Sequence, residues 1–227
     1  MRHESPLLDR LEPRDRARLL DRAVSRRLHA GQSLYLAGDD GRRAHIVLSG
    51  VVKLAARSDD GDVAILCLAC PGDIVGEIAA LDGGPQPLDA IAATTSEVLG
   101  IDAEQLVEAL ALNPSAALEL ARGLARRTRW LGLAALERTT RSVPARLAGR
   151  LLDLADVLGR ADCGTIELEL PLAQEDLGRL AGMCRESACK TLRAFKREGL
   201  LDYRGRRLRI LRPDALERIR CSGRGRA

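Results

Sequence analysis

Two short helical patterns separated by a glycine constrain the fold of this chain most strongly. The first pattern places apolar side chains at helical spacing, at Leu177, Leu180 and Ala181. Gly182 is expected to end this helix, because glycine adopts positive φ without steric cost. A second helix is predicted from about Arg185 to Glu198, with an apolar face of Ala188, Leu192 and Phe195. Together the patterns indicate two helices joined by a tight turn.

The open face of the second predicted helix carries long polar side chains, namely Arg185, Glu186, Lys190 and Arg193. A helix, a glycine turn and a polar second helix form the pattern of a helix-turn-helix, whose second helix enters the major groove of DNA. An ordinary helical hairpin with a solvated charged face would show the same pattern. The two helices alone leave these alternatives open.

A β-hairpin is predicted directly after the second helix, in residues 199–211. Apolar side chains alternate with polar ones on either side of a turn, at Leu201, Tyr203, Leu208 and Ile210. The turn itself is basic and contains Arg204-Gly205-Arg206. A winged helix-turn-helix has such a hairpin after its recognition helix, and the basic tip binds phosphates without reading sequence. This order of elements favours DNA binding over a plain helical hairpin.

Charge is distributed unevenly along the 227 residues. Residues 1–140 carry 17 basic and 20 acidic side chains, whereas residues 141–227 carry 19 basic and 12 acidic ones. The positive part contains the helix-turn-helix pattern, as a polyanionic partner requires. No run approaches the roughly 18 apolar residues of a membrane span, and no signal peptide opens the chain. We therefore expect a cytoplasmic protein without a membrane partner.

The N-terminal part of the chain predicts helices first and short strands afterwards. Residues 5–25 have the apolar spacing of one or two short helices. From Leu28 to Ile101, short apolar runs alternate with turn residues. Evenly spaced short strands of this kind indicate a β-sandwich or a small barrel.

A long helix is predicted from the Asn113-Pro114 break to about Arg141. Its apolar positions include Ala117, Leu120, Leu124, Leu131 and Ala135. A narrow seam of this kind often pairs with a copy of itself, and we favour that dimer over a helix packed only on its own barrel. Val143-Pro144 is expected to break the chain, since proline cannot continue a helix. The predicted domains are residues 1–112, 113–142 and 143–227.

These elements, with the turn segment Pro71-Gly-Asp-Ile-Val-Gly-Glu-Ile78, resemble the Crp–Fnr transcription factors, which include the cyclic-AMP receptor protein. The resemblance implies an α+β fold: an N-terminal cyclic-nucleotide-binding-type β-barrel (jelly roll), a long dimerisation helix and a C-terminal winged helix-turn-helix. It also implies a homodimeric transcriptional regulator rather than an enzyme. Its expected partners are double-stranded DNA with a palindromic operator, and RNA polymerase.

The resemblance assigns base recognition to Arg185, Glu186 and Lys190. Arginine pairs bidentately with guanine, glutamate accepts from cytosine N4, and lysine donates to guanine. Lys190 stands where the cyclic-AMP receptor protein usually has arginine, so it keeps the charge but loses the planar fork. Phosphate contacts are expected at Gln174, Cys184, Arg193, Arg204, Arg206 and Arg207.

Cys184 is expected at the N-cap of the recognition helix, where the family usually has serine. A thiol caps a helix poorly and donates poorly to a phosphate. The helix N-terminus and Arg185 favour the thiolate, which leads to the hypothesis that oxidation at Cys184 weakens DNA binding. The alternative, which we favour, is a tolerated replacement of serine without a signalling role.

The effector-pocket candidates are Gly76, Glu77, Ile78, Gln86, Pro87, Leu131 and Gly132. In cyclic-nucleotide binders of the family, a Gly-Glu pair meets the ribose and an Arg-Ser/Thr pair holds the cyclic phosphate. Gln86 and Pro87 replace that second pair, so neither a positive charge nor a hydroxyl is present. The polar adenine contacts on the long helix are also missing. A buried phosphate without its cation is strongly unfavourable, so we do not expect ordinary cyclic AMP as the effector, which stays unknown.

The six cysteines do not form a metal-ligand pattern. Cys67 and Cys70 have the spacing of a metal or redox pair, but no second close pair completes four ligands. Positions three apart in a strand also point to opposite faces. We therefore interpret both as small apolar residues and expect no metal and no catalytic residues. The alternative function is an effector- or thiol-responsive sensory barrel whose C-terminal domain mediates protein contacts.

Overall fold

The computed structural model of the chain describes residues 5–58, 60–170 and 172–222. It divides into two compact units, Met1–Trp130 and Leu131–Ala227, whose boundary lies inside one long helix. Because that helix contributes to both units, the predicted three-part division stays a prediction. Within the described ranges, no helix combines the length and the apolar character needed to cross a membrane.

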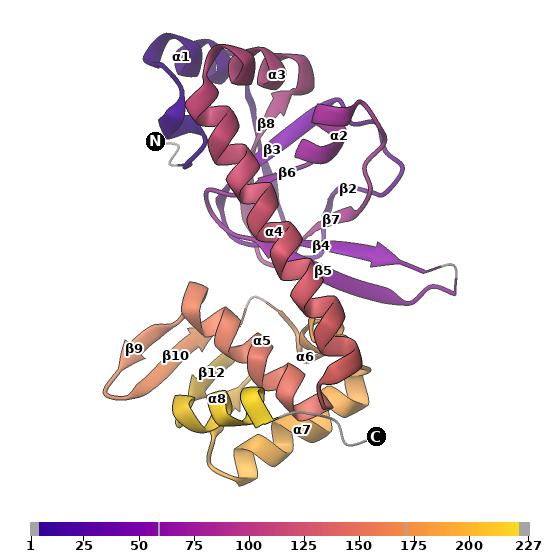
Figure 1. The fold of residues 1–227 in the computed structure, drawn as a ribbon, viewed down its shortest axis with the longest axis vertical. Coiled ribbons are helices and arrows are strands. Elements are labelled where there is room, and N and C mark those ends of the chain that lie inside the picture. The colour runs from indigo at the N-terminus through magenta and orange to yellow at the C-terminus, as the bar shows by residue number, and fades with distance from the viewer. Residues whose placement is uncertain (1–4, 59, 171, 223–227) are drawn as a thin grey trace. The chain divides into compact units, whose positions relative to one another are not determined.

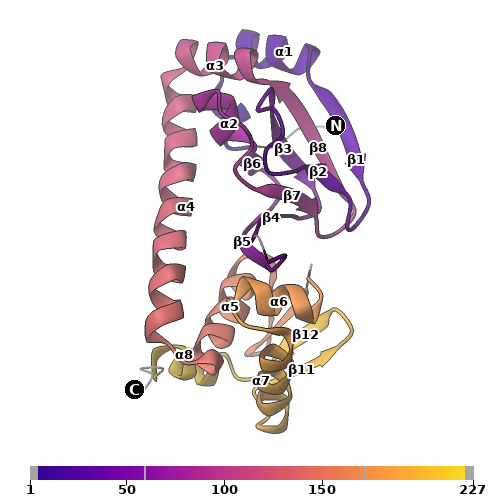
Figure 2. The ribbon, with the colours of Figure 1, turned by 90° about the vertical axis from the view of Figure 1, so that its right-hand side faces the viewer.

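The first unit combines short helices with antiparallel strands (Figure 1). Its elements are η1 (Leu8–Arg10), α1 (Pro13–Asp21), β1 (Val24–Leu28), β2 (Ser33–Tyr35), β3 (Arg43–Ser49), β4 (Val52–Arg57), β5 (Val63–Ala69), β6 (Ile74–Val75), α2 (Glu77–Asp82), β7 (Asp89–Ala92), β8 (Ser96–Asp102), α3 (Ala103–Leu112) and the first part of α4 (Pro114–Thr140). The helices α1 and α3 lie side by side in both views (Figure 2).

The strands of the first unit form two four-stranded sheets, in the orders β1-β8-β3-β6 and β2-β7-β4-β5. All their pairings are antiparallel, and β8 pairs with both β1 and β3. Strands distant in sequence are therefore neighbours, which is typical of a jelly-roll barrel. The predicted fold class is confirmed for this part of the chain.

Strand β3 is buried on both faces, which explains its nearly continuous apolar run. Ala44 and Ile46 belong to a cluster shared with the helices. Val47 belongs to a second cluster, which takes side chains from both sheets and includes Val98 of β8. Because side chains alternate along a strand, adjacent residues contribute to different cores. This strand thereby joins the helical layer to the barrel interior.

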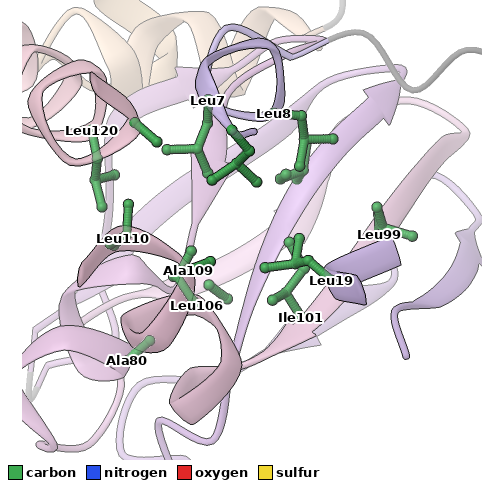
Figure 3. Packing of buried hydrophobic residues seen from close by; sticks show 14 residues of the cluster. Leu7, Leu8, Leu19, Ala80, Leu99, Ile101, Leu106, Ala109, Leu110 and Leu120 are labelled. Atoms are coloured by element: carbon green, nitrogen blue, oxygen red, sulfur yellow. The ribbon is translucent and has the colours of Figure 1, made fainter. Parts of the chain in front are cut away.

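A leucine-rich cluster packs the helices onto the barrel (Figure 3). Members shown there include Leu7, Leu8, Leu19, Leu99, Ile101, Leu106, Leu110 and Leu120. They come from the N-terminal turn, α1, β8, α3 and α4. Full burial of one leucine side chain stabilises a fold by roughly 1.5–3 kcal/mol. The cluster therefore fixes the start of α4 on the barrel.

Asn113 joins three helices at the predicted break between α3 and α4. Its Oδ1 accepts from the backbone N–H of Glu12 at 2.8 Å. Its Nδ2 donates to the Asp15 carboxylate at 2.7 Å and to the Ala109 carbonyl at 2.9 Å. A buried amide is tolerated when its polar atoms are paired in this way. Asn113 is thus a structural junction as well as a helix end.

The long helix α4 exposes an apolar stripe that shares only Ala135 with the one expected. Ala117, Leu120 and Leu124, assigned above to a dimer seam, pack against the core cluster of their own unit. A second stripe is exposed along the helix, at Leu118, Ala121, Ala125, Thr128, Gly132 and Ala135. The sequence contains both stripes, and packing on the barrel decides which one is covered.

The second unit contains the end of α4, followed by α5 (Val143–Leu158), β9 (Arg160–Asp162), β10 (Thr165–Glu169), α6 (Gln174–Leu180), α7 (Arg185–Arg197), β11 (Leu201–Arg204), β12 (Arg207–Ile210) and α8 (Pro213–Ser222). Its strands form one sheet in the order β11-β12-β10-β9. The sequence patterns did not predict β9 or α8, because β9 has only three exposed residues and α8 is short.

The predicted break at Val143-Pro144 is displaced in the structure. Ser142 is the N-cap, and Pro144 lies within the first turn of α5. Proline is tolerated there because the N–H groups of the first turn have no intrahelical partner. Buried charge then ties α4 to α5, since Arg150 donates to Glu137 and to Asp153 at 2.6 Å each.

Candidate nucleic-acid interface and sensory site

Helix α7 separates a buried face from a charged exposed face. Ala188, Leu192 and Phe195 are buried, while the predicted base-reading and phosphate residues Arg185, Glu186, Lys190 and Arg193 are exposed. This separation follows from the helical period, which repeats a face every three or four residues. Gly182, with φ of 64°, makes the turn that lets α7 follow α6.

The exposed side chains of α7 line one open concavity, formed by Arg185, Glu186, Cys189, Lys190, Arg193 and Arg197. Among the described residues, no carboxylate forms an ion pair with any of these four cations. Arg179 of α6 contrasts with them, because it pairs with Glu175 at 2.7 Å and with Asp176 at 3.3 Å. The concavity therefore keeps its positive charge and its donors available for another molecule. Sequence reasoning did not place Cys189 or Arg197 on this face.

Cys184 occupies the N-cap of α7, as predicted, but its side chain makes no capping hydrogen bond. Its Sγ lies 3.2 Å from Ser187 Oγ. The contact with the Ser187 hydroxyl is the main cause that holds the pKa of the Cys184 thiol below its ordinary value. The nearby Ser187 backbone N–H adds to this effect, although it does not have the geometry of a capping hydrogen bond. The thiol is exposed. Its role at a phosphate stays a prediction.

Gln174 is brought to the edge of the same concavity by a contact with α7. It is the first residue of α6, and its Oε1 accepts from Cys189 Sγ at 3.4 Å. The two residues are fifteen positions apart in the chain. The interface thus includes one polar side chain of α6 next to the basic face of α7.

The predicted wing is the hairpin of β11 and β12, which lies beside α7 (Figure 2). Arg204 of β11 lies opposite Arg207 of β12 in the antiparallel ladder. The turn between them contains Gly205, with φ of 61°. The three wing arginines predicted to contact phosphates, Arg204, Arg206 and Arg207, are exposed. The Leu170 N–H donates to the Arg206 carbonyl at 2.7 Å and anchors the tip to the strand side of the unit.

A lysine of α7 holds the wing in place. Lys196 Nζ lies 2.6 Å from the Asp202 carboxylate and 5.2 Å from the centroid of the Tyr203 ring. The hydrogen bond from Lys196 lowers the pKa of Asp202, and the Tyr203 backbone N–H adds to it. The recognition helix and the wing therefore present their arginines from connected elements.

In the barrel unit, Gly76 and Glu77 lie at the start of α2. Gly76 has φ of 77°, and a Cβ there would lie 2.9 Å from the Arg43 carbonyl oxygen. The Glu77 side chain is only 2% exposed and forms an ion pair with Arg127. Arg127 also donates to the Ile74 carbonyl at 3.0 Å. Sequence reasoning did not identify Arg127, because fifty residues separate it from Glu77.

Burial and Arg127 act in opposite directions on Glu77. Burial raises the pKa of the Glu77 carboxyl, and the adjacent guanidinium offsets part of that rise. The guanidinium is in turn committed to a carboxylate and a carbonyl. This pair contributes no net charge to the site.

Gln86 is buried beside Gly76, and its part in an effector pocket stays a prediction. Its side chain is 3% exposed. A Cβ added to Gly76 would lie 3.2 Å from Gln86 Nε2 and 3.3 Å from the Tyr35 ring, so the three residues pack closely. Gln86 Oε1 has no hydrogen-bond partner among the described residues. Two other candidates, Ile78 and Pro87, are exposed. Leu131 and Gly132 belong to the second unit, so their part in an effector site stays a prediction.

Three further arginines of the barrel unit also form ion pairs with carboxylates. Arg57 lies 2.7 Å from the buried Asp89 carboxylate. Arg43 lies 2.8 Å from Asp102, and Arg42 lies 3.2 Å from Asp40. Burial pushes the pKa of Asp89 upward, but the Ala37 N–H and Arg57 together bring it below its ordinary value. Burial lowers the pKa of His45 to about 4, so this ring is neutral near pH 7.

The two cysteines of the barrel are neutral thiols. Burial raises the pKa of both Cys67 and Cys70 to about 11. Cys67 packs against the core cluster between the sheets. Among the described residues, no group of three or more His, Cys, Asp or Glu side chains is placed to hold a metal ion.

Comparisons with known proteins agree with this two-part organisation. A family model for the cyclic nucleotide-binding domain matches residues 25–113, and one for the Crp-like helix-turn-helix domain matches residues 145–219. The chain is 31% identical over 188 residues to the CRP-like cAMP-activated global transcriptional regulator of Mycobacterium tuberculosis, covering 83% of this chain and 84% of that protein.

Solved structures show the same fold. A transcriptional regulator of the CRP family from Thermus thermophilus superimposes with a TM-score of 0.74 at 30% identity, over 89% of this chain and all of that one. FixK2 from Bradyrhizobium japonicum gives a TM-score of 0.77 at 23% identity, over 87% of this chain and 96% of that one. The relatives are transcriptional regulators rather than enzymes, as expected. With its cyclic-nucleotide-binding-type barrel and its Crp-like helix-turn-helix, this chain belongs to the Crp–Fnr family of transcriptional regulators.

Proposed function

We propose that the chain acts as a homodimeric, sequence-specific DNA-binding regulator that reads a palindromic operator through Arg185, Glu186 and Lys190. The observation that carries the proposal is the exposed face of α7, whose cations have no ion-pair partner among the described residues. Contact with RNA polymerase and a cytoplasmic location belong to the same proposal, since a regulator of this kind acts on transcription of the chromosome.

The chemistry of this face fits base recognition better than protein contacts. Arg185 and Lys190 supply donors for guanine O6 and N7, and Glu186 supplies an acceptor for cytosine N4. Arg193 and the wing arginines supply charge for phosphates. The centre of a protein-binding surface is enriched in aromatic anchors and depleted in lysine and glutamate, whereas the concavity on α7 has no aromatic residue and contains Lys190 and Glu186.

The exposed stripe of α4 supports the dimer. Its six residues follow a repeat of three and four, from Leu118 to Ala135, and five of them are small. Such a repeat fits the seam of two helices that wind around each other. Small side chains also let the two helix backbones approach closely. A dimer of this kind would present two copies of α7, which matches a palindromic site.

We propose further that ordinary cyclic AMP does not gate this protein, although the relative from Mycobacterium tuberculosis is described as cAMP-activated. The arginines of the barrel that could meet a phosphate are each paired with a carboxylate. Gln86, at the predicted phosphate position, is neutral and buried. Freeing Arg57 or Arg127 for a cyclic phosphate would leave the buried carboxylate of Asp89 or Glu77 without its cation, which is unfavourable.

A DNA-binding titration without any added ligand tests the proposal. Half-sites selected from genomic fragments would be offered as palindromic duplexes, and binding followed by fluorescence anisotropy. We expect operator binding by the parent and loss of guanine discrimination in Arg185→Ala. Arg218→Ala, which removes an equal charge from the exposed side of α8, is the matched control and should bind like the parent.

Two outcomes would contradict the proposal. If the parent shows no sequence preference at any salt concentration, the alternative of a C-terminal domain that only mediates protein contacts is favoured. If Arg185→Ala and Arg218→Ala weaken binding equally on all sequences, α7 does not read bases.

A further inference from the structure

The thiol of Cys189 connects the base-reading helix to the neighbouring helix of the motif. Cys189 lies one helical turn after Arg185 and one turn before Arg193, within the same concavity. It is half-buried, and its Sγ donates to Gln174 Oε1 at 3.4 Å. This hydrogen bond links the first residue of α6 to the centre of the exposed face of α7.

The hydrogen bond determines which end of the Gln174 amide remains available. An amide has an acceptor oxygen and a nitrogen with two donor hydrogens. The oxygen is taken by the Cys189 thiol, while Nε2 makes no hydrogen bond with a described residue. A DNA phosphate accepts hydrogen bonds and repels a carbonyl oxygen. The observed orientation is therefore the one that suits a phosphate.

We propose that Cys189 is a positioning residue for DNA binding, whose thiol holds the Gln174 amide with its nitrogen free to donate to a backbone phosphate. This inference rests on the proposed function, since it assumes that the concavity on α7 faces DNA. Without the thiol, the amide is free to turn over and present its oxygen instead. Serine at position 189 would keep the donor, whereas alanine would remove it while conserving most of the volume.

A double-mutant cycle tests the coupling between the two residues. The full-length proteins Cys189→Ala, Gln174→Ala and the double variant would be titrated against the selected operator. Loss of one net hydrogen bond corresponds to a decrease in affinity on the order of threefold to tenfold. We expect each single variant to show a decrease of this size and the double variant to show little more, because both changes remove the same contact.

A phosphate scan supplies a readout that a purely structural role would not change. Each backbone phosphate of one half-site is replaced in turn by a neutral methylphosphonate. In the parent, one replacement should weaken binding through the loss of the Gln174 contact. That position should become insensitive in Gln174→Ala and in Cys189→Ala, and should stay sensitive in Cys189→Ser, the matched control.

The outcomes separate this inference from the function on which it rests. Additive losses in the cycle, parental affinity in Cys189→Ala, or an unchanged phosphate scan in Cys189→Ala would overturn the role of Cys189 while Arg185-dependent operator binding stands. Absence of Arg185-dependent binding in the parent would overturn the proposed function itself, and this inference with it.

Discussion

Arg127 of α4 donates to the buried carboxylate of Glu77, fifty residues earlier in the chain at the start of α2. The Glu77 side chain is almost completely withdrawn from solvent, and Arg127 is the cation that neutralises it. The contact joins the long helix α4 to the turn at which α2 begins. Because the pair is buried, the stability of the first unit depends on both partners being present.

Removing Arg127 should destabilise the first unit in a pH-dependent manner. Burial raises the pKa of Glu77, so the folded chain holds a proton there more readily than the unfolded chain. Stability from such a group is complete at low pH and falls as pH rises through the folded pKa. We expect Arg127→Met to lower the free energy of unfolding by about 3–5 kcal/mol near pH 8. The loss should be smaller near pH 5, because removing the guanidinium raises the pKa of Glu77 further and a protonated carboxyl needs no cation.

Urea unfolding followed by the fluorescence of Trp130, the only tryptophan, measures this effect. Arg129→Met removes an exposed arginine from the same helix and is the control. Adding Glu77→Gln to Arg127→Met should recover part of the loss, because the uncompensated charge is gone. An equal loss at both pH values would contradict the role assigned to the buried charge.

The wing should contribute affinity without sequence information. Arg206 lies at the exposed turn between β11 and β12, and no base-reading geometry is expected there. We predict that Arg206→Ala weakens binding to all duplexes alike and reduces the slope of log affinity against log salt by about one. Arg185→Ala should instead lose about 1–3 kcal/mol at one guanine of each half-site. Titrations at several salt concentrations on cognate and scrambled duplexes distinguish the two patterns.

Cyclic AMP should bind weakly or not at all. Calorimetry with the purified protein is expected to show no tight binding, and operator affinity should not change when the nucleotide is added. The reason is the neutral Gln86 together with the paired arginines of the barrel. A micromolar dissociation constant accompanied by a clear rise in operator affinity would refute this prediction. Substitution of Arg57 by methionine would then show whether that arginine leaves Asp89 for the phosphate.

Placing a charge on the exposed stripe of α4 should disrupt the dimer. Ala125 lies in the middle of the stripe, and two copies of a buried glutamate would face each other across a helix pair. We expect Ala125→Glu to be monomeric by light scattering and to lose operator affinity. Ala111→Glu makes the same change at an exposed position of α3 and should stay dimeric. A monomeric parent would refute the dimer outright.

Replacing Cys184 by serine should strengthen the start of α7. The thiol makes no capping hydrogen bond, whereas a serine hydroxyl accepts well from the free N–H groups of the first turn. We expect a gain of about 0.5–1 kcal/mol in the free energy of unfolding of the second unit, measured by denaturant titration. The same two proteins test the oxidation hypothesis through operator binding before and after mild peroxide. Equal loss in both, or no loss in the parent, rejects that hypothesis.

Local periodicity is sufficient to identify the exposed charged face of α7 from the sequence alone. Ala188, Leu192 and Phe195 recur at helical spacing, so their burial determines which side chains remain exposed. The wing follows in the same way from an alternating pattern around Gly205. Both features depend on residues close together in the chain. For the same reason the spacing of the N-terminal strands predicted a β-sandwich or a small barrel, and the family resemblance indicated the barrel.

The tertiary structure decided the contacts between distant residues. The sequence contains two apolar stripes on α4, and only packing against the barrel selects Leu120 and Leu124 for the core, leaving Ala125 exposed. The pairing of Glu77 with Arg127 has no local signal, because either residue alone reads as a solvated charge. The strands and helices that enclose them exclude water, and that burial turns two ordinary charges into an obligatory pair.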